Sequence, residues 1–388
     1  MQHPTVATPA HLKFLDGMRA FAALFVVCHH CMLQVWAGGP SSKLAHIIIG
    51  VLRSGRSAVD VFIVLSGFCL ALPVVKAGGC MNCSAVDFIK KRTRRIVLPY
   101  YCALALSLAM IALFIGSKTG THWDVSIPVT SQSIIYHLLL LQDLSAATNS
   151  NINHVFWSIS VEYRIYFIFP LLVSGWSKFG PWVTTVIVAV FAYAVVLIDM
   201  MLKLPFYYNF VPQYFILFAL GCLTCLIAKS DEVRSVTVGK LGRGSVCFVL
   251  IVILVLIAGR LFTHHSISWL AARIYYALCV QDLMTGVGTM IILLIAMSAP
   301  QGLINRFFSW RPLAFTGTFS YSIYLIHAPL LQFIQQYVLF GGGMGPHAAH
   351  KCFWFTVLLA VSLPTVIVTA YGFYQLFEKP FTRKVLGW

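Results

Sequence analysis

Long apolar segments recur along the whole chain, separated by short polar or basic stretches. A helix needs about 20 mostly apolar residues to cross the hydrocarbon core of a bilayer, and about ten segments approach that length. The pattern therefore predicts an all-α, polytopic integral membrane bundle of about ten transmembrane helices. The predicted spans are residues 14–36, 58–75, 96–115, 155–174, 182–202, 211–228, 246–262, 275–298, 313–340 and 353–377.

The polar segments between these helices are short. The longest, residues 116–133, is predicted to be an outside loop, and residues 133–144 are predicted to form an interfacial helix. Length alone would suggest two or three soluble domains. The apolar pattern overrides that estimate, and we expect residues 1–388 to form a single transmembrane domain with no separate soluble domain.

Composition supports a lipid environment. The chain is 59% hydrophobic and only 10% charged, whereas soluble domains usually carry roughly 25% charged residues. So few charges could not cover the surface of a soluble protein of this length. A bilayer removes that need, because lipid accepts apolar side chains on the protein surface.

The formal net charge of +16 changes the picture in one respect only. On a soluble protein it would suggest nucleic acid, but here the basic residues lie mostly between apolar segments, so no nucleic-acid partner is expected. With the N-terminus inside, 17 basic residues fall on the cytoplasmic side and 8 outside. Since cytoplasmic loops carry the excess of Lys and Arg, both termini are predicted to be cytoplasmic, in a plasma (inner) membrane.

The first predicted helix contains four ionisable residues, Asp16, Arg19, His29 and His30. Ionisable side chains are costly inside a membrane, so each is a functional candidate. Arg19 and His30 are eleven residues apart, which places them on one helix face about 16 Å apart, whereas His29 points about 100° away from His30. Asp16 precedes Arg19 by three residues, within reach of an ion pair.

A deep histidine on the face that carries Arg19 suits acyl transfer. Histidine can take a proton from an acceptor hydroxyl or accept the acyl group itself, and its ordinary pKa near 6.5 permits either role. The alternative is a structural histidine that is hydrogen-bonded within the bundle. The shared face of Arg19 and His30 favours the catalytic interpretation.

The basic run at residues 90–95 is predicted to be a cytoplasmic loop before the third predicted helix, and it has two interpretations. It can be a topology signal in contact with anionic lipid. It can also be a clamp for the phosphates of a nucleotide-bearing donor, because arginine forks match phosphate oxygens. The run satisfies both.

Several motifs occur in a fixed order along the chain and together resemble the acyltransferase-3 family of membrane acyltransferases. The spacing of Arg19 and His30 is similar to that family's arginine–histidine spacing. The chain departs from that family at two points: Arg164 stands where a glutamine is common, which bears on the local pocket, and the spacing from Arg95 to Pro99 is one residue longer than usual. The matching segments are residues 15–30, 57–68, 92–96, 157–162, 320–327 and 378–381.

The resemblance implies an acyl-coenzyme A donor at the cytoplasmic side, with acetyl-coenzyme A as the expected donor. It also implies a carbohydrate or glycolipid acceptor, a sugar hydroxyl on an envelope glycan or lipid-linked saccharide. Arg19, Arg92 and Arg95 would bind the donor phosphates, and His30 would be the catalytic histidine. Whether His30 is acylated or only moves a proton is left open.

Other residues are candidates for supporting roles. Glu162 can orient an imidazole or act as a second base, or it can simply form a buried ion pair with Arg164 or with another helix. Asp60 and Ser66 can bind acceptor hydroxyls, although helix packing is the favoured interpretation for Ser66. His327 is expected to position other groups rather than to act as the base.

No metal is expected from the cysteine motifs. Residues 28–31 fan around one helix and cannot close a tetrahedral site, and the pairs Cys80–Cys83 and Cys222–Cys225 lack obvious partners. The oligomeric state is left open.

Two other classes of protein remain as alternatives. A polytopic transporter of a small anionic solute would use the same intramembrane charges, but it predicts inverted repeats and broken helices in matching halves. Another histidine-dependent membrane acyltransferase family would place an Asn–His pair on late helices. The ordered motifs favour the acyltransferase-3 resemblance over both.

Overall fold

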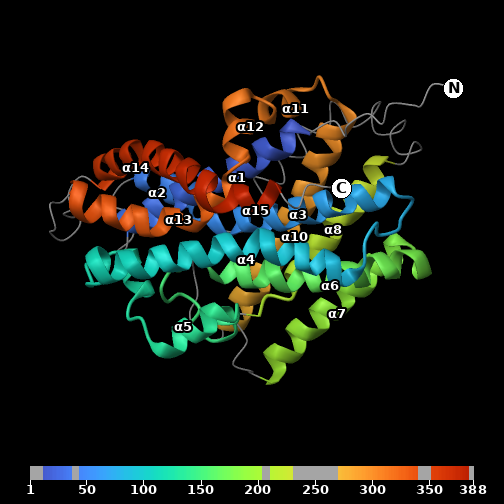
Figure 1. Cartoon of the computed structure of the whole chain (residues 1–388), viewed down its shortest axis with the longest axis horizontal. Helices are drawn as coiled ribbons and strands as arrows, with labels where there is room; N and C mark the ends of the chain where they lie inside the picture. Colours follow the sequence, from blue (N-terminus) through green and yellow to red (C-terminus); the bar gives the residue numbers. More distant parts are fainter. Residues whose placement is uncertain (1–11, 37–42, 203–209, 230–269, 340–350, 384–388) are drawn as a thin grey trace.

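The structure is a computed structural model that describes residues 12–36, 43–202, 210–229, 270–339 and 351–383. These residues form helices and connecting segments without strands. The predicted all-α membrane bundle is confirmed (Figure 1). Within the described part of the chain, five helical segments are long and apolar enough to span a bilayer: Lys13–Val35, Lys43–Lys76, Ala85–Ile115, Cys279–Ser298 and Lys351–Phe381.

The first half of the chain supplies the helices around the site. They are α1 (Lys13–Val35), α2 (Lys43–Leu52), α3 (Gly55–Lys76), α4 (Ala85–Met110) with the π-helical turn η1 (Ile111–Ile115), the short η2 (His122–Ser126), α5 (Ser131–Leu138), η3 (Gln142–Leu144) and α6 (Trp157–Phe179).

The second half continues with further helices. They are α7 (Pro181–Leu202), α8 (Gln213–Lys229), α10 (Leu270–Ser298), α11 (Leu303–Phe308), α12 (Arg311–Gly317), α13 (Ser320–Phe333), η4 (Ile334–Leu339), α14 (Lys351–Phe373), η5 (Tyr374–Glu378) and α15 (Lys379–Arg383). The predicted span at residues 246–262 lies outside the described residues.

Three predicted boundaries were wrong. The predicted span 96–115 begins at Ala85 instead, because Ser84 caps the helix by accepting a hydrogen bond from the Asp87 amide. The predicted span 313–340 is broken between α12 and α13. The interfacial helix predicted at residues 133–144 is the shorter α5, followed by the separate turn η3.

Helix α1 occupies the interior of the bundle. It contacts α3, α12, α13 and α14 (Figure 1), and most of its apolar side chains are buried. Helix α4 packs against α6 and against α13, which in turn contacts α1. Residues along α1 therefore face neighbours from both halves of the chain.

Helices α3 and α8 pack most closely where each has a glycine. A Cβ atom at Gly67 would overlap the carbonyl oxygen of Phe218, and one at Gly221 would overlap that of Val64. Small residues allow helix backbones in membranes to approach in this way. The contact fixes α3, which carries Ser66 and Cys69, against α8.

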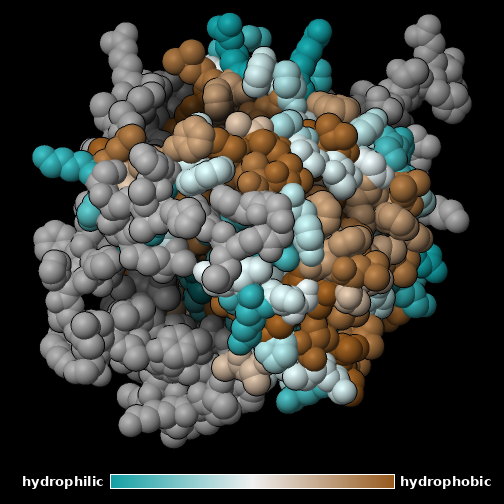
Figure 2. Space-filling view, turned by 90° about the vertical axis from the view of Figure 1, so that its left-hand side faces the viewer, coloured by the Kyte–Doolittle hydropathy of each residue, from teal (hydrophilic) through white to brown (hydrophobic). Residues whose placement is uncertain are grey.

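The outer surface is strongly apolar, as a lipid-facing surface requires. Large hydrophobic side chains such as Leu113, Leu171 and Val368 are about 70% exposed. In the view of Figure 2, hydrophobic residues cover much of the right-hand half of the surface. The protein is therefore a multi-pass membrane protein.

Candidate active site

The two ends of one α1 face carry different chemistry. Arg19 forms the expected ion pair with Asp16, with 3.3 Å between Nη1 and Oδ1. Its Nη2 also donates to the Cys69 sulfur of α3 at 3.1 Å. His30 lies three turns farther along, about 16 Å away along the helix axis.

Arg92 and Arg95 of α4 lie in the same electrostatic environment as Arg19. All three guanidinium groups interact electrostatically with the Glu162 carboxylate of α6. The Arg92 guanidinium also lies over the rings of Phe88 and Tyr166, at 5.6 and 5.8 Å from the centroids. We call Arg19, Arg92, Arg95 and Glu162 the arginine cluster.

The basic run is not a loop, as the sequence suggested, but the first turns of α4. Its side chains therefore point in different directions. Arg92 and Arg95 are partly buried, whereas Arg94 is exposed. The helix thus separates the basic residues that face the cluster from one that does not.

Glu162 is hydrogen-bonded to its helix neighbour. The Tyr166 hydroxyl donates to Oε1 of Glu162 at 2.5 Å, and it lies 3.3 Å from the hydroxyl of Ser66. Tyr166 therefore connects Ser66 of α3 to Glu162 of the arginine cluster.

The pairing of Glu162 with Arg164 was wrong. Arg164 instead pairs with the buried Asp143 of η3, and its guanidinium lies over the Phe210 ring. Residues 162 and 164 point to different sides of α6, because two positions on a helix are about 200° apart. The departure at Arg164 therefore ties α6 to the connection before it.

Glu378 was not singled out from the sequence as a site residue. It accepts a hydrogen bond from the buried Ser322 hydroxyl at 2.5 Å and interacts with Arg95 and Arg19. Its motif at residues 378–381 was the available signal. The arginine cluster therefore has a second carboxylate nearby.

Four histidines gather at the other end. The His30 ring lies 4.9 Å from the His154 ring and 5.0 Å from the His327 ring, centroid to centroid. His122 is 4.7 Å from His154 and 6.1 Å from His30. We call His30, His122, His154 and His327 the histidine cluster.

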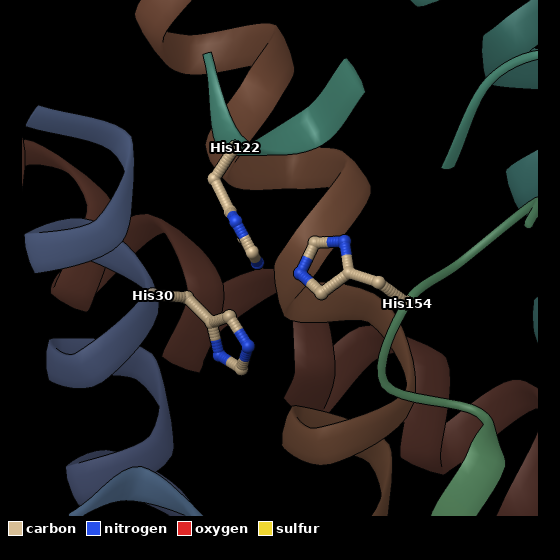
Figure 3. Close-up of side chains that lie close together, drawn as sticks. All are labelled: His30, His122 and His154. Atoms are coloured by element: carbon tan, nitrogen blue, oxygen red, sulfur yellow. The ribbon is translucent and has the colours of Figure 1, made fainter. Parts of the chain in front are cut away.

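Three separate elements supply the rings drawn in Figure 3. His30 projects from α1, His122 from the start of η2 and His154 from the segment before α6. His327 comes from α13. His327 was predicted to be a supporting residue, but His122 and His154 were missed, because they lie in a connection without helical periodicity.

Hydrogen bonding determines which nitrogen of His30 is free. Nδ1 of His327 lies 2.8 Å from the Tyr324 carbonyl and 3.2 Å from the Ile323 carbonyl, so this nitrogen carries the hydrogen. Nε2 of a neutral His327 is then an acceptor. It lies 3.1 Å from Nδ1 of His30, which therefore donates.

The same assignment satisfies the backbone of α1. Nδ1 of His30 also lies 2.9 Å from the Val26 carbonyl, another acceptor. With its hydrogen on Nδ1, a neutral His30 has its lone pair on Nε2. That nitrogen can take a proton, attack a carbonyl carbon or bind a metal ion.

His29 is placed differently from His30. Its Nδ1 lies 2.7 Å from the Leu52 carbonyl, and its Cβ direction differs by about 100°. The His29 ring nevertheless lies 4.9 Å from the His30 ring, centroid to centroid, and His29 interacts electrostatically with His154 and His327.

His154 is held neutral by its surroundings. Burial, followed by the nearby His122, lowers the pKa of His154 well below its ordinary value, and burial also lowers the pKa of His122. Nδ1 of His154 lies 3.1 Å from the Ser126 hydroxyl.

Asp60 is part of a third polar group. It is fully buried and interacts with Arg56 and Tyr214. Arg56 forms an ion pair with Asp282 of α10 at 3.1 Å. Asp60 therefore lies in a polar group that joins α3, α8 and α10.

The fold and its two clusters define a multi-pass membrane protein with a basic site and an imidazole site on one helix. Comparison with known sequences assigns the class: a family model described as an acyltransferase domain matches residues 12–374. The chain belongs to the acyltransferase-3 family.

Two curated relatives match nearly the whole chain. YrhL of Bacillus subtilis, assigned as a peptidoglycan O-acetyltransferase, is 24% identical over 97% of this chain and 58% of its own length. The O-acetyltransferase OatA of Staphylococcus aureus is 23% identical over 86% of this chain and 53% of its own. The chain spans about half the length of these relatives.

A third relative matches a shorter region. Acyltransferase MdmB of Streptomyces mycarofaciens is 30% identical over 41% of this chain and 38% of its own length. No solved structure matches.

Proposed function

We propose that this protein is an O-acyltransferase that moves an acyl group, expected to be acetyl, from acyl-coenzyme A to a hydroxyl of an envelope saccharide or lipid-linked glycan. One observation carries the proposal: the arginine cluster and the histidine cluster lie at the two ends of one face of α1. A donor with an anionic end and a reactive end is complementary to such a pair. The name of YrhL supports the acceptor class, and the name of OatA supports transfer of an acetyl group to oxygen.

The donor would bind by its phosphates at the arginine cluster. Guanidinium forks form paired hydrogen bonds with phosphate oxygens, and Arg19, Arg92 and Arg95 all lie near the Glu162 carboxylate. The separation of Arg19 and His30 is comparable to an extended pantetheine arm. The thioester would then reach the histidine cluster.

The transfer itself would use Nε2 of His30. This nitrogen takes the proton of the acceptor hydroxyl while the hydroxyl oxygen attacks the thioester carbonyl carbon. The carbon–sulfur bond then breaks, and the leaving thiolate receives the proton from His30. In the covalent variant the same nitrogen takes the acyl group first.

His327 would position His30 rather than react. By accepting the Nδ1 hydrogen of His30, it holds the ring in the tautomer that leaves Nε2 free. Glu162 would balance the charge of the arginines at the donor site, with Tyr166 and Ser66 beside it. Asp60, which interacts with Arg56 and Tyr214, would organise the α3–α8–α10 interface.

We further propose that the chain works as one transmembrane domain in the plasma (inner) membrane, with both termini in the cytoplasm and the arginine cluster on that side. The support is the 17 to 8 split of basic residues. Reporter fusions at each terminus test this topology. Termini on opposite sides, or both outside, would contradict it.

The activity is tested with the purified full chain, acetyl-coenzyme A and envelope glycan fragments. We expect acetylated glycan by mass spectrometry and release of free coenzyme A. His30→Ala should abolish both products. Accumulation of a small anion in vesicles without any acetylated product would favour the transporter alternative instead.

A further inference from the structure

Three imidazoles of the histidine cluster converge without an acid or a cysteine between them. Each of His30, His122 and His154 offers one ring nitrogen, and these nitrogens all lie within 4.8 Å of one another. They come from α1, η2 and the segment before α6 (Figure 3). Convergence of three elements on one point calls for a chemical explanation beyond a single base.

We propose that His30, His122 and His154 form a binding site for a divalent transition metal ion of the zinc class. The site shares only His30 with the cysteine motif at residues 28–31, from which the sequence argued against a metal, and its other two ligands come from elsewhere in the chain. The assignment goes beyond the proposed function, and only its effect on acyl transfer rests on that function.

The free nitrogens have the electronic character that a metal requires. Metal ions bind the unprotonated imidazole nitrogen, and the hydrogen-bonding pattern leaves the lone pair of His30 on Nε2. Nε2 of His154 is buried and has no hydrogen-bond partner. A buried polar atom without a partner is costly, and a bound ion would satisfy it.

The opposite ring nitrogens are held in the manner of known metal sites. Metal-binding histidines usually direct their other nitrogen to a carbonyl, carboxylate or water, which fixes the ring. Here Nδ1 of His30 contacts the Val26 carbonyl and His327, while Nδ1 of His154 contacts the Ser126 hydroxyl. When Nδ1 of His154 donates to Ser126, Nε2 is left as a ligand.

The spacing is compatible with an ion after small side-chain movements. Zinc–nitrogen bonds of about 2.0–2.1 Å in a tetrahedral site place the ligand nitrogens about 3.4 Å apart. The observed limit of 4.8 Å then requires shifts on the order of 1 Å, which rotations about the side-chain bonds supply. His30 and His122 remain partly exposed, so the ion has an approach.

Three imidazoles suit zinc, copper or nickel better than calcium or magnesium, which prefer oxygen ligands. Three protein ligands also leave one tetrahedral position open. An ion bound here would use the same lone pair that His30 needs to accept a proton or an acyl group. Metal binding and His30 chemistry therefore exclude one another, and the ion should inhibit transfer.

Binding is measured on the full chain in detergent with Co²⁺, whose visible spectrum reports tetrahedral coordination, and with competing Zn²⁺. We expect one ion per chain. His122→Asn and His154→Gln should each weaken binding on the order of 100-fold or more, since even loss of an outer hydrogen-bond partner costs 10–100-fold. His46→Asn, on the exposed face of α2, is the matched control and should bind normally.

Equal Co²⁺ affinity in wild type, His122→Asn and His154→Gln would overturn the proposal, as would an absence of stoichiometric binding in wild type. A second measurement needs no variant. Diethyl pyrocarbonate modifies free imidazoles, and Zn²⁺ should protect His30 and His154 in wild type, as read by peptide mass spectrometry. Unprotected histidines at saturating Zn²⁺ would also overturn it.

The effect on transfer is tested separately. Zn²⁺ should inhibit acetyl transfer with the same midpoint as it displaces Co²⁺, and a chelator should restore the rate. Activation by Zn²⁺ would contradict the exclusion of His30 chemistry. If no transfer is found but histidine-dependent binding is, the metal site stands and the proposed function falls.

Discussion

The arginine cluster and the histidine cluster share helix α1 but are built in opposite ways. The arginine cluster is made by side chains of helices α1, α4 and α6, and its charges are balanced by Glu162 and by aromatic faces. The histidine cluster takes two of its four members from the connection between α4 and α6. One end holds fixed charge, and the other holds neutral lone pairs.

This difference teaches how the two halves of a transfer reaction can be separated on one scaffold. Arginine stays protonated at any physiological pH, so the first cluster can bind an anion under all conditions. Neutral imidazoles respond to protons, metal ions and neighbours. Changes at the first cluster should therefore alter binding, and changes at the second should alter chemistry.

The largest expected effect is at His30. His30→Ala should lower acyl transfer by at least about 10²–10⁴-fold, the usual contribution of a positioned base, and more if the histidine is a covalent carrier. The rate is measured at matched membrane expression with saturating donor. Donor binding should change little.

His29→Ala is the control for this comparison. Its ring is directed to the Leu52 carbonyl, so a much smaller loss of transfer is expected. A live His30→Ala, or a dead His29→Ala beside it, would overturn the assignment of the catalytic histidine.

The next effect is at the opposite end. The double variant Arg92→Gln, Arg95→Gln should weaken donor binding by at least about 100-fold, because each lost charged hydrogen bond costs roughly 1.5–3 kcal/mol. Lysine replacements should rescue only partly, since lysine lacks the planar fork. Titration calorimetry with acetyl-coenzyme A reads the change.

The exposed Arg94 supplies a matched control on the same helix. Arg94→Gln removes the same charge from the same basic run, yet donor affinity should stay within about twofold of wild type, because exposed charges contribute little. Equal weakening by Arg94→Gln would mean that only the overall charge of the run matters.

A smaller effect is expected from His327. His327→Leu removes the acceptor for the Nδ1 hydrogen of His30, and we expect the turnover number to fall about tenfold, with donor affinity unchanged. His327→Gln retains an acceptor oxygen and should recover part of the rate. A Gln variant no better than Leu would assign His327 to packing alone.

The smallest effect is on stability, and its sign follows from the lowered pKa values of His122 and His154. The unfolded chain binds protons at these histidines below about pH 6.5, whereas the folded chain does not. Stability therefore falls as the pH drops through 6.5 toward the lowered values. We expect the wild-type melting temperature in detergent to fall by a few °C more than that of His122→Gln, His154→Gln.

An equal fall of the melting temperature with pH in wild type and in the double variant would contradict this account. Donor binding at the arginine cluster should change far less over the same pH interval, because guanidinium does not titrate there. Calorimetric donor titrations above and below pH 6.5 check that contrast.

Local patterns in the sequence explain which parts of this architecture could be predicted. Arg19, Asp16 and His30 lie on one helix, so their relation follows from helical spacing. His122 and His154 could not be placed, because they are far apart in the chain and are brought together by tertiary packing of a connection. Pairing of Arg164 with Asp143 likewise depends on how that connection folds back.

The start of α4 shows a signal that was present but outweighed. Ser84 and Asp87 form a capping pattern three residues apart, yet the dense charge at residues 90–95 was interpreted as a loop. Charged residues are compatible with a helix when they extend beyond the hydrocarbon core. Hydropathy therefore underestimates helices that begin outside the membrane.

The paired glycines of α3 and α8 have a consequence for genetics. Because the Cβ of an alanine at Gly67 would overlap the Phe218 carbonyl oxygen, a single methyl group must wedge the two helices apart. That displacement would move Ser66 and Cys69 without altering any reactive group. Gly67→Ala is thus a candidate conditional allele: growth temperature, rather than chemistry, would decide whether the cell has a functional protein.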